Sequence, residues 1–263
     1  MQAVGEGATY PGFPDWIVPD WPAPLHVRAV CTTRTGGVSQ GVYRSLNLGD
    51  HVGDATVDVA ANRMRLHAAI GVRPVFLKQV HGVDVLELDD ATPDGAEADA
   101  CMATAPGVAC TIMVADCLPV LFASACGRRV AAAHAGWRGL ASGVLERTLQ
   151  RVRGTSDMAP VTWLGPCIGP RAFEVGSEVK AVFEAHAPEA ADHFRAVNGS
   201  GKWCADLAGL ARQRLRAAGV ESVHGNDGSD AWCTVRSPLG FFSHRRDGVS
   251  GRFAACVWID ARA

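Results

Sequence analysis

The chain has 263 residues, and its 48% hydrophobic and 20% charged content is typical of a globular protein, which excludes a disordered or fibrous chain. A formal net charge of -2 at pH 7 provides no general attraction to nucleic acid or to an anionic membrane, so neither is expected as a partner. The length suits one large α/β or α+β unit, and we expect a single domain over residues 1–263.

The N-terminal part of the chain combines an irregular start with one strand and one helix. Residues 1–24 are rich in proline and contain two tryptophans, which predicts an irregular strap packed by aromatic rings. A β-rich run at 27–33 predicts a strand that ends in a turn at 34–37. Apolar residues at helical spacing predict a helix over 54–70, and Gly71 provides its stop signal.

The remainder of the chain mixes strands and helices. Short apolar runs predict strands at 75–80, 83–88, 107–115, 118–124, 128–133, 161–164 and 253–259. Helical periodicity predicts helices over 136–152, 176–186 and 206–218. Because strands and helices do not alternate strictly, the sequence favours an α+β fold, with mixed sheets covered by helices, over a doubly wound sheet.

The cysteines and the first residues indicate a reducing compartment. The chain has nine cysteines, an odd number, and none of them forms a CxxC pair, which disfavours a disulfide framework. The first residues lack the basic and apolar regions of a secretion signal, and the longest apolar run, 107–125, is interrupted by Asp116. We therefore expect a cytoplasmic protein with reduced thiols.

Several familiar functional motifs are missing from the sequence. Gly199-Ser-Gly-Lys202 resembles the end of a phosphate-binding loop, but Trp203 stands where a Ser or Thr would hold magnesium. The chain contains no GxGxxG, no HExxH and no HxH. Since clustered imidazoles normally build multicopper centres, the lack of HxH disfavours a multicopper oxidase.

Three residues with metal-ligating side chains lie where predicted strands give way to turns or glycines. These are His81, Cys117 and His134. Two imidazoles and one thiolate are the ligand set of a catalytic zinc that keeps its fourth position open. Taken singly, each residue also fits a structural role, because buried cysteines pack as small hydrophobes and histidines beside glycine commonly bond within turns.

Asp116 strengthens the case for a site next to Cys117. A carboxylate inside an apolar run costs several kcal/mol unless another group pairs with it or donates a hydrogen bond to it. Two roles are expected from the sequence, namely capping a turn or holding a metal-ligating imidazole from behind.

Seven segments, in order along the chain, resemble one known family. They are RTGGV at 34–38, SLNL at 45–48, KQVHG at 78–82, ADCLP at 115–119, HAGWRG at 134–139, GPCIG at 165–169 and FSHRRD at 242–247. From about Val27 to Ile259 the chain resembles the family formerly described as polyphenol oxidase or laccase domains. That family is now described as purine nucleoside phosphorylase and adenosine deaminase of the YfiH and LACC type.

The resemblance implies a fold, an activity and a metal. The implied fold is a single catalytic domain, an α+β layered sandwich of mixed sheets flanked by helices, related to a bacterial toxin deamidase. The implied metal is zinc, with copper as the alternative, held by His81, Cys117 and His134, which would also be the catalytic residues. The implied activities are phosphorolysis of adenosine, inosine and methylthioadenosine, and deamination of adenosine to inosine, which make the chain a transferase and a hydrolase.

Four further residues are candidates for binding nucleoside and phosphate. Arg34, beside two glycines, and Arg138, near the start of a predicted helix, offer positive charge for phosphate. Asn47 and Gln79 carry amides able to contact purine or ribose. Each of the four is equally compatible with a solvated or turn-forming role. The chain departs from the family pattern at Cys31, at 171–173 and at Ala211, which leaves its substrate range open.

Three other functions stay open at this point. Cys117 could act as a nucleophile with His134 as its base, which would give a metal-free hydrolase or deamidase. A copper-dependent polyphenol oxidase would need several coppers. A non-enzymatic, partner-binding module would use its zinc only to stabilise the fold.

Overall fold

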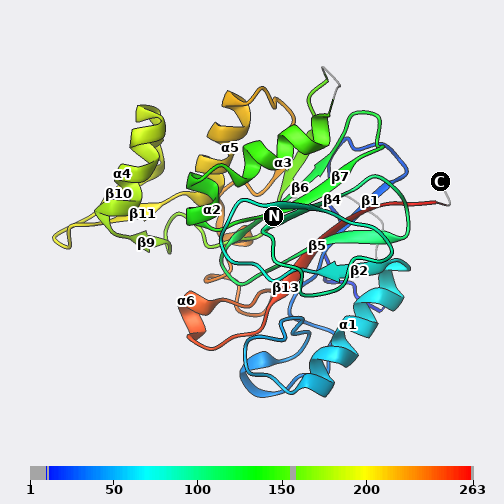
Figure 1. The fold of residues 1–263 in the computed structure, drawn as a ribbon. Coiled ribbons are helices and arrows are strands. Elements are labelled where there is room, and N and C mark those ends of the chain that lie inside the picture. Colours follow the sequence, from blue (N-terminus) through cyan, green and yellow to red (C-terminus); the bar gives the residue numbers. More distant parts are fainter. Residues whose placement is uncertain (1–9, 11, 155–157, 262–263) are drawn as a thin grey trace.

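The computed structural model describes residue 10 and residues 12–154 and 158–261. Two β-sheets are stacked face to face, and helices cover their outer faces (Figure 1). Both sheets contain parallel as well as antiparallel strand pairs, which confirms the predicted α+β fold of mixed sheets flanked by helices. Within the described residues, no helix is long and apolar enough to cross a membrane.

The larger sheet has six strands in the order β12-β8-β6-β7-β4-β3. Their bounds are Val223–Gly225 (β12), Val161–Leu164 (β8), Leu118–Ala123 (β6), Val130–Ala135 (β7), Ala100–Ala103 (β4) and Val85–Glu87 (β3). The pairs from β8 to β4 are antiparallel, whereas β12 and β3 pair in parallel at the two edges. The sequence predicted β3, β6, β7 and β8 but not β4 or β12.

The second sheet has four strands in the order β1-β13-β5-β2. Their bounds are Val27–Cys31 (β1), Phe253–Ile259 (β13), Val108–Val114 (β5) and Arg73–Phe76 (β2). The predicted strands at 27–33, 107–115 and 253–259 are confirmed. The strand expected at 75–80 ends earlier, at Phe76, and the segment after it forms the turn that carries His81.

Alternate residues of the strands fill the space between the two sheets, because successive side chains of a strand point to opposite faces. Cys110 and Ile112 of β5 meet Leu121 of β6 and Ala132 of β7 in this inner core. Every residue of β5, β6 and β7 is buried, so both faces of these strands lie in apolar surroundings. That burial explains why the strands appear in the sequence as unbroken apolar runs.

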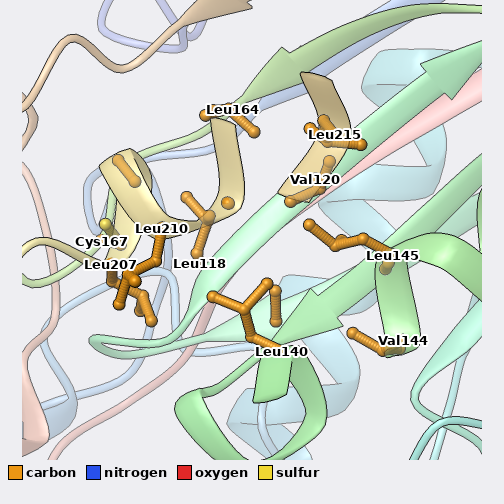
Figure 2. Close-up of a cluster of buried hydrophobic side chains, with 14 of the residues drawn as sticks. Leu118, Val120, Leu140, Val144, Leu145, Leu164, Cys167, Leu207, Leu210 and Leu215 are labelled. Atoms are coloured by element: carbon orange, nitrogen blue, oxygen red, sulfur yellow. The ribbon is translucent and has the colours of Figure 1, made fainter. Parts of the chain in front are cut away.

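The outer face of the six-stranded sheet is covered by helices α2 (Trp137–Ala141), α3 (Val144–Arg153) and α5 (Leu207–Ala217). Figure 2 shows Leu145 and Leu215 of these helices packed beside Val120 of β6. The prediction of a single helix over 136–152 is wrong, because the chain forms two helices there, α2 and α3, with a break at Gly143. That residue has φ 96°, a left-handed conformation that glycine adopts at little cost.

The outer face of the four-stranded sheet is covered by α1 (Thr56–Ile70), which buries Leu66 and Ile70 against it and ends at Gly71 as predicted. The N-terminal strap adds to this side. Phe13 and Trp16 stack with ring centroids 4.2 Å apart. Residues 1–9 and 11 of the strap lie outside the described residues.

A smaller unit extends to one side of the main body (Figure 1). It contains α4 (Ser177–His186) and a three-stranded sheet of β9 (Glu174–Val175), β10 (Phe194–Val197) and β11 (Lys202–Ala205). Gly199-Ser-Gly-Lys202 spans the turn from β10 into β11, so it joins two strands of a hairpin. The remaining helices are α6 (His244–Asp247) and three short 3-10 helices at Gly41–Tyr43, Pro188–His193 and Asp230–Trp232.

Candidate metal centre and cavity

Three side chains from separate segments meet at one end of the six-stranded sheet. His134 is near the end of β7, Cys117 directly precedes β6, and His81 lies in the turn after β2. Their ligand atoms all lie within 4.8 Å of one another, and Cys117 Sγ is 3.7 Å from His81 Nε2. The structure thus brings together the three residues that the sequence indicated as a set.

A buried carboxylate, Asp99, holds two of these residues in place. It directly precedes β4 and lies opposite His134 on β7, whose backbone N–H donates to the Asp99 carbonyl at 2.7 Å. Residues opposite each other on paired strands share a face, so the two side chains are adjacent. The Asp99 side chain is fully buried, and its Oδ1 accepts a hydrogen bond from His134 Nδ1 at 2.8 Å.

The same carboxylate fixes the turn that carries His81. Asp99 Oδ1 accepts from the His81 backbone N–H at 2.9 Å, and Oδ2 accepts from Val80 N at 3.0 Å and Gly82 N at 2.6 Å. His81 has φ 63°, a left-handed conformation that is uncommon for a residue with a side chain. Three converging N–H donors on one carboxylate stabilise this unusual turn.

The contact with Asp99 also determines which nitrogen of His134 is available to a metal. Because His134 Nδ1 donates a hydrogen bond to the carboxylate, Nε2 is the nitrogen left to face a metal, and in the neutral ring it carries the lone pair. Metal-ligating histidines usually have this arrangement, in which a carboxylate fixes the tautomer and the ring orientation.

Electrostatic effects favour the thiolate form of Cys117. Burial by itself raises the pKa of this thiol, but the charge and hydrogen bonds of His134 and His81 outweigh burial and lower the pKa to about 6. For His134 burial has the opposite effect and lowers the pKa, but the Cys117 charge and the hydrogen bond to Asp99 raise it to about 9. The thiolate is the form of cysteine that binds metals, and it is also the form that acts as a nucleophile.

The donor set fits a zinc ion. Zinc binds sulfur at about 2.3 Å and imidazole nitrogen at about 2.0 Å, so tetrahedral geometry places two such donors about 3.5 Å apart. The separation of 3.7 Å between Cys117 Sγ and His81 Nε2 is close to that value. Three protein donors leave a fourth coordination position for a water or a substrate. Across residues 10, 12–154 and 158–261, His81, Cys117 and His134 are the one group of three or more side chains suited to a metal.

Gly136 forms the tightest wall of this site. A Cβ atom at Gly136 would lie 2.7 Å from His81 Cδ2 and 3.0 Å from Cys117 Sγ. Both distances are shorter than normal van der Waals contacts, so any larger residue would displace the two ligands. The backbone here has φ -63° and ψ 158°, which alanine adopts without strain.

Gly136→Ala is therefore expected to weaken zinc binding without unfolding the chain. Overpacking by one methyl group costs about 1–3 kcal/mol, which corresponds to a loss of about fivefold to 150-fold in zinc affinity. Competition with a chromophoric chelator measures this affinity. The melting temperatures of variant and wild type in excess chelator should agree, and an unchanged zinc affinity would contradict the described contact.

A cavity of about 390 Å³ opens beside the three residues. Its walls include the apolar side chains of Met113, Ile168 and Phe173. Its polar lining residues, besides the three candidate ligands, are His51, Gln79, Asp116, His244, Arg245 and Arg252. A cavity of this size, with apolar walls and convergent polar side chains, is typical of a small-molecule site.

Of the four residues expected to bind substrate, Gln79 lines the cavity and the other three lie elsewhere. The Gln79 amide is occupied, because Nε2 donates to Met113 O at 2.8 Å and Oε1 accepts from Met113 N at 2.9 Å. Asn47 is fully buried and its Oδ1 accepts from the backbone N–H of Arg252 at 2.8 Å. Asn47 thereby positions a residue that does line the cavity.

The two arginines predicted from the sequence make local contacts. Arg34 donates to the carbonyls of Arg44 at 2.9 Å and Pro238 at 3.0 Å. Arg138 is exposed and stacks on Trp137, with its guanidinium carbon 4.3 Å from the ring centroid. Neither guanidinium belongs to the lining of the cavity.

Asp116 takes the first of its two expected roles, that of a turn cap. Its Oδ1 accepts from Thr234 Oγ1 at 2.6 Å and its Oδ2 accepts from Arg245 N at 2.7 Å. Its φ of 98° is left-handed, and these two bonds hold that conformation. The imidazole of His134 is held by Asp99 instead.

The sequence reasoning missed Asp99 and Arg252. Asp99 has the same sequence signal as Asp116, because it is a carboxylate inside an apolar run, Ala98 to Ala103. No comparable signal marks Arg252, which precedes the last strand and resembles any polar residue at a strand start.

Comparisons with known proteins identify the family of this chain. A family model described as multi-copper polyphenol oxidoreductase laccase matches residues 28–260. A purine nucleoside phosphorylase of Pseudomonas aeruginosa is 52% identical over 244 residues, which cover 93% of this chain and 98% of that protein. The purine nucleoside phosphorylase YfiH of Escherichia coli is 48% identical over 245 residues, covering 92% of this chain and 98% of that protein.

A solved structure shows the same fold. The crystal structure of Neisseria meningitidis protein NMB0706 superposes with a TM-score of 0.89 at 46% identity, covering 94% of this chain and 100% of that chain. The chain therefore belongs to the multi-copper polyphenol oxidoreductase laccase family, in which its relatives include YfiH and other proteins named purine nucleoside phosphorylases.

Proposed function

We propose that this chain is a zinc-dependent purine nucleoside phosphorylase, acting on adenosine, inosine and methylthioadenosine, and that it also deaminates adenosine. The observation that carries this proposal is the group of two imidazoles and one thiolate, with ligand atoms within 4.8 Å of one another, on the wall of a cavity of about 390 Å³. The names of the relatives from Pseudomonas aeruginosa and Escherichia coli support the phosphorylase activity.

Phosphorolysis exchanges one bond at the sugar for another. A phosphate oxygen forms a bond to the anomeric carbon as the bond from that carbon to the purine nitrogen breaks. The bonding electron pair leaves with the purine, which takes the proton of hydrogen phosphate, and the products are the free base and ribose 1-phosphate. A zinc ion held by His81, Cys117 and His134 would supply Lewis-acid charge next to the reacting groups.

The residues of the chain orient and enclose the reactants. Met113, Ile168 and Phe173 provide apolar surface against which a purine ring can pack. Phe173 is buried and adds an aromatic face suited to stacking. These walls limit the access of water, which would otherwise compete with phosphate at the anomeric carbon.

Deamination of adenosine uses the same cavity but requires water in place of phosphate. An oxygen from water bonds to purine carbon 6 as the bond to the amino nitrogen breaks, and ammonia leaves after it takes a proton. His51 and His244 line the cavity with imidazoles that can carry such a proton.

A metal-free hydrolase remains the second candidate, because one observation favours it. Cys117, His134 and Asp99 form the series of nucleophile, base and orienting carboxylate that cysteine hydrolases use. The copper oxidase reading finds less support, since multicopper catalysis needs further clusters of metal ligands and the described residues provide one group.

The direct test incubates zinc-loaded protein with adenosine, with and without phosphate, and separates the products by chromatography. Inosine and methylthioadenosine are assayed in parallel with phosphate. We expect adenine to form only when phosphate is present. Inosine should form in both samples, and part of it should be converted to hypoxanthine where phosphate is present. Chelation should stop both reactions and added zinc should restore them. Activity that survives chelation and is blocked by a thiol reagent would favour the metal-free hydrolase.

A further inference from the structure

Two arginines that the sequence did not indicate as phosphate ligands line the cavity. Arg252 is half-buried, whereas Arg245 is exposed at the rim. They reach the cavity from different segments, since Arg245 lies in α6 and Arg252 directly precedes β13. Their backbone and side-chain contacts show how each one is held.

Arg252 is fixed by backbone oxygen atoms. Its Nη1 donates to Ser250 O at 2.9 Å, Gly251 O at 3.1 Å and Ser250 Oγ at 3.4 Å, and its backbone N–H donates to Asn47. These contacts use one nitrogen of the guanidinium. The Nε and Nη2 donors have no hydrogen bond within the described chain, so they are available to a ligand.

Arg245 is held in a similar way. Its Nη1 donates to Glu174 O at 3.1 Å and Ala172 O at 3.4 Å, and its backbone N–H donates to Asp116. The guanidinium carbon lies 5.6 Å from the centroid of the Phe173 ring, within the range of a cation–π contact. As with Arg252, the other N–H groups of this guanidinium have no hydrogen-bond partner in the part of the chain that the structure describes.

Neither arginine belongs to an ion pair within the described residues. The hydrogen-bond partners of the two guanidinium groups are carbonyl and hydroxyl oxygens. Asp116 is the one carboxylate of the lining, and its oxygens accept from Thr234 and from a backbone N–H. Burial lowers the pKa of Arg252, and the charges of Cys117 and Asp116, which line the same cavity, oppose that effect.

We propose that Arg252 and Arg245 form the phosphate subsite of this cavity, with Arg252 as the inner ligand and Arg245 as the ligand at the rim. This assignment rests on the proposed phosphorylase function. Guanidinium groups offer paired N–H donors that match the oxygens of phosphate, and they stay charged under all working conditions. Two arginines held in advance by backbone carbonyls lose little conformational entropy when the anion binds.

The position of the subsite has a chemical consequence. Arg252 and Cys117 line the same cavity, so phosphate held by Arg252 would share that cavity with the candidate metal. The apolar walls at Met113 and Ile168 remain for the purine. Phosphate and base would then occupy separate parts of the cavity, as displacement at the carbon between them requires.

Arg252→Gln, Arg252→Lys and Arg245→Gln in the zinc-loaded protein test this assignment. Arg151→Gln is the matched control, because it removes one charge from a surface ion pair with Glu87. The measurements are the KM for phosphate at saturating inosine, the dissociation constant for inosine without phosphate, and calorimetric binding of phosphate alone. Zinc content and melting temperature show whether each variant is folded.

Loss of a hydrogen-bonded charge is worth about 1.5–3 kcal/mol, so Arg252→Gln should raise the KM for phosphate by about 10-fold to 100-fold. Arg245→Gln should have a smaller effect because its guanidinium is more solvated, and Arg252→Lys should restore part of the affinity. The dissociation constant for inosine should stay within about twofold of wild type, since these donors are assigned to the anion.

Two results would overturn the subsite. One is an unchanged KM for phosphate in folded Arg252→Gln, and the other is an increase found instead in Arg34 or Arg138 variants. Failure of the proposed function has a different signature, in which wild type forms no ribose 1-phosphate. Calorimetry still decides the subsite in that case, because phosphate binding lost in Arg252→Gln supports it and binding retained there refutes it.

Discussion

Asp99→Asn is expected to lower zinc affinity by about 10-fold to 100-fold, the usual effect of removing a carboxylate behind a metal-ligating histidine. The substitution keeps the size of the side chain but replaces one acceptor oxygen by an NH₂ donor. Each Asp99 oxygen accepts two hydrogen bonds, from His134 and His81 at Oδ1 and from Val80 and Gly82 at Oδ2. Whichever way the amide turns, its NH₂ group therefore faces two donors.

In one orientation of the new amide, a change in the tautomer of His134 relieves part of the clash between donors. If the NH₂ group faces His134 Nδ1, that nitrogen can become an acceptor when its proton moves to Nε2. A protonated Nε2 has no lone pair for a metal, so relief of the clash removes a ligand. The metal-free chain should also lose about 1–3 kcal/mol of unfolding free energy, because buried donors are left unpaired.

Chelator competition and urea unfolding measure the two effects of Asp99→Asn. Asp84→Asn is the control, since the Asp84 side chain is 86% exposed and this substitution changes the formal charge by the same amount as Asp99→Asn. Nitrogen NMR of labelled histidine should show the altered tautomer of His134 in the Asp99 variant. A variant that binds zinc as tightly as wild type would show that Asp99 does not position the ligand.

Cys117→Ala is expected to lower phosphorolysis by about a thousandfold and to abolish stoichiometric zinc binding, because it removes the one sulfur donor. Wild type treated with chelator should fall to a similar rate and recover when zinc is added, whereas the variant should not recover. Cys126→Ala is the control, since Cys126 is exposed and lies in the turn between β6 and β7.

The outcome of this comparison also separates the metal enzyme from the cysteine hydrolase. Both accounts predict that Cys117→Ala is inactive, so the variant alone does not distinguish them. Chelated wild type does, because a nucleophilic thiolate needs no metal. Full activity of a chelated, zinc-free wild type would contradict the metal account.

The sequence predicted the elements whose signals are local. The apolar runs that form β5, β6 and β13 are seven, six and seven residues long and fully buried, and such runs identify central strands. The helices α1, α4 and α5 follow the predicted periodicity. The strand β4 was missed because its four residues, Ala-Cys-Met-Ala, are short and lack β-branched side chains.

The site was predictable in its chemistry but not in its geometry. His81, Cys117 and His134 were identifiable from ligand chemistry and from the resemblance to a family. Their meeting point depends on the register of β6, β7 and β4, which pairs residues far apart in the chain. The role of Asp99 follows from that register alone, since it lies 35 positions from His134.

The arginines that line the cavity could not be predicted from the sequence either, because their positions depend on tertiary contacts. Arg34 and Arg138 stand beside glycines, and that local feature made them candidates. The contacts of Arg34 with Arg44 and Pro238 come from tertiary packing. The position of Arg252 depends on its long-range bond to Asn47, 205 residues away in the sequence.

The central claim is best tested by X-ray absorption at the zinc edge of purified, zinc-loaded protein. We predict one sulfur at about 2.3 Å and two imidazole nitrogens at about 2.0 Å, with a further light-atom ligand from solvent. The sulfur should disappear from the spectrum of any zinc that remains in Cys117→Ala. A wild-type spectrum without sulfur, or with four protein donors and no solvent ligand, would contradict an open centre built from His81, Cys117 and His134.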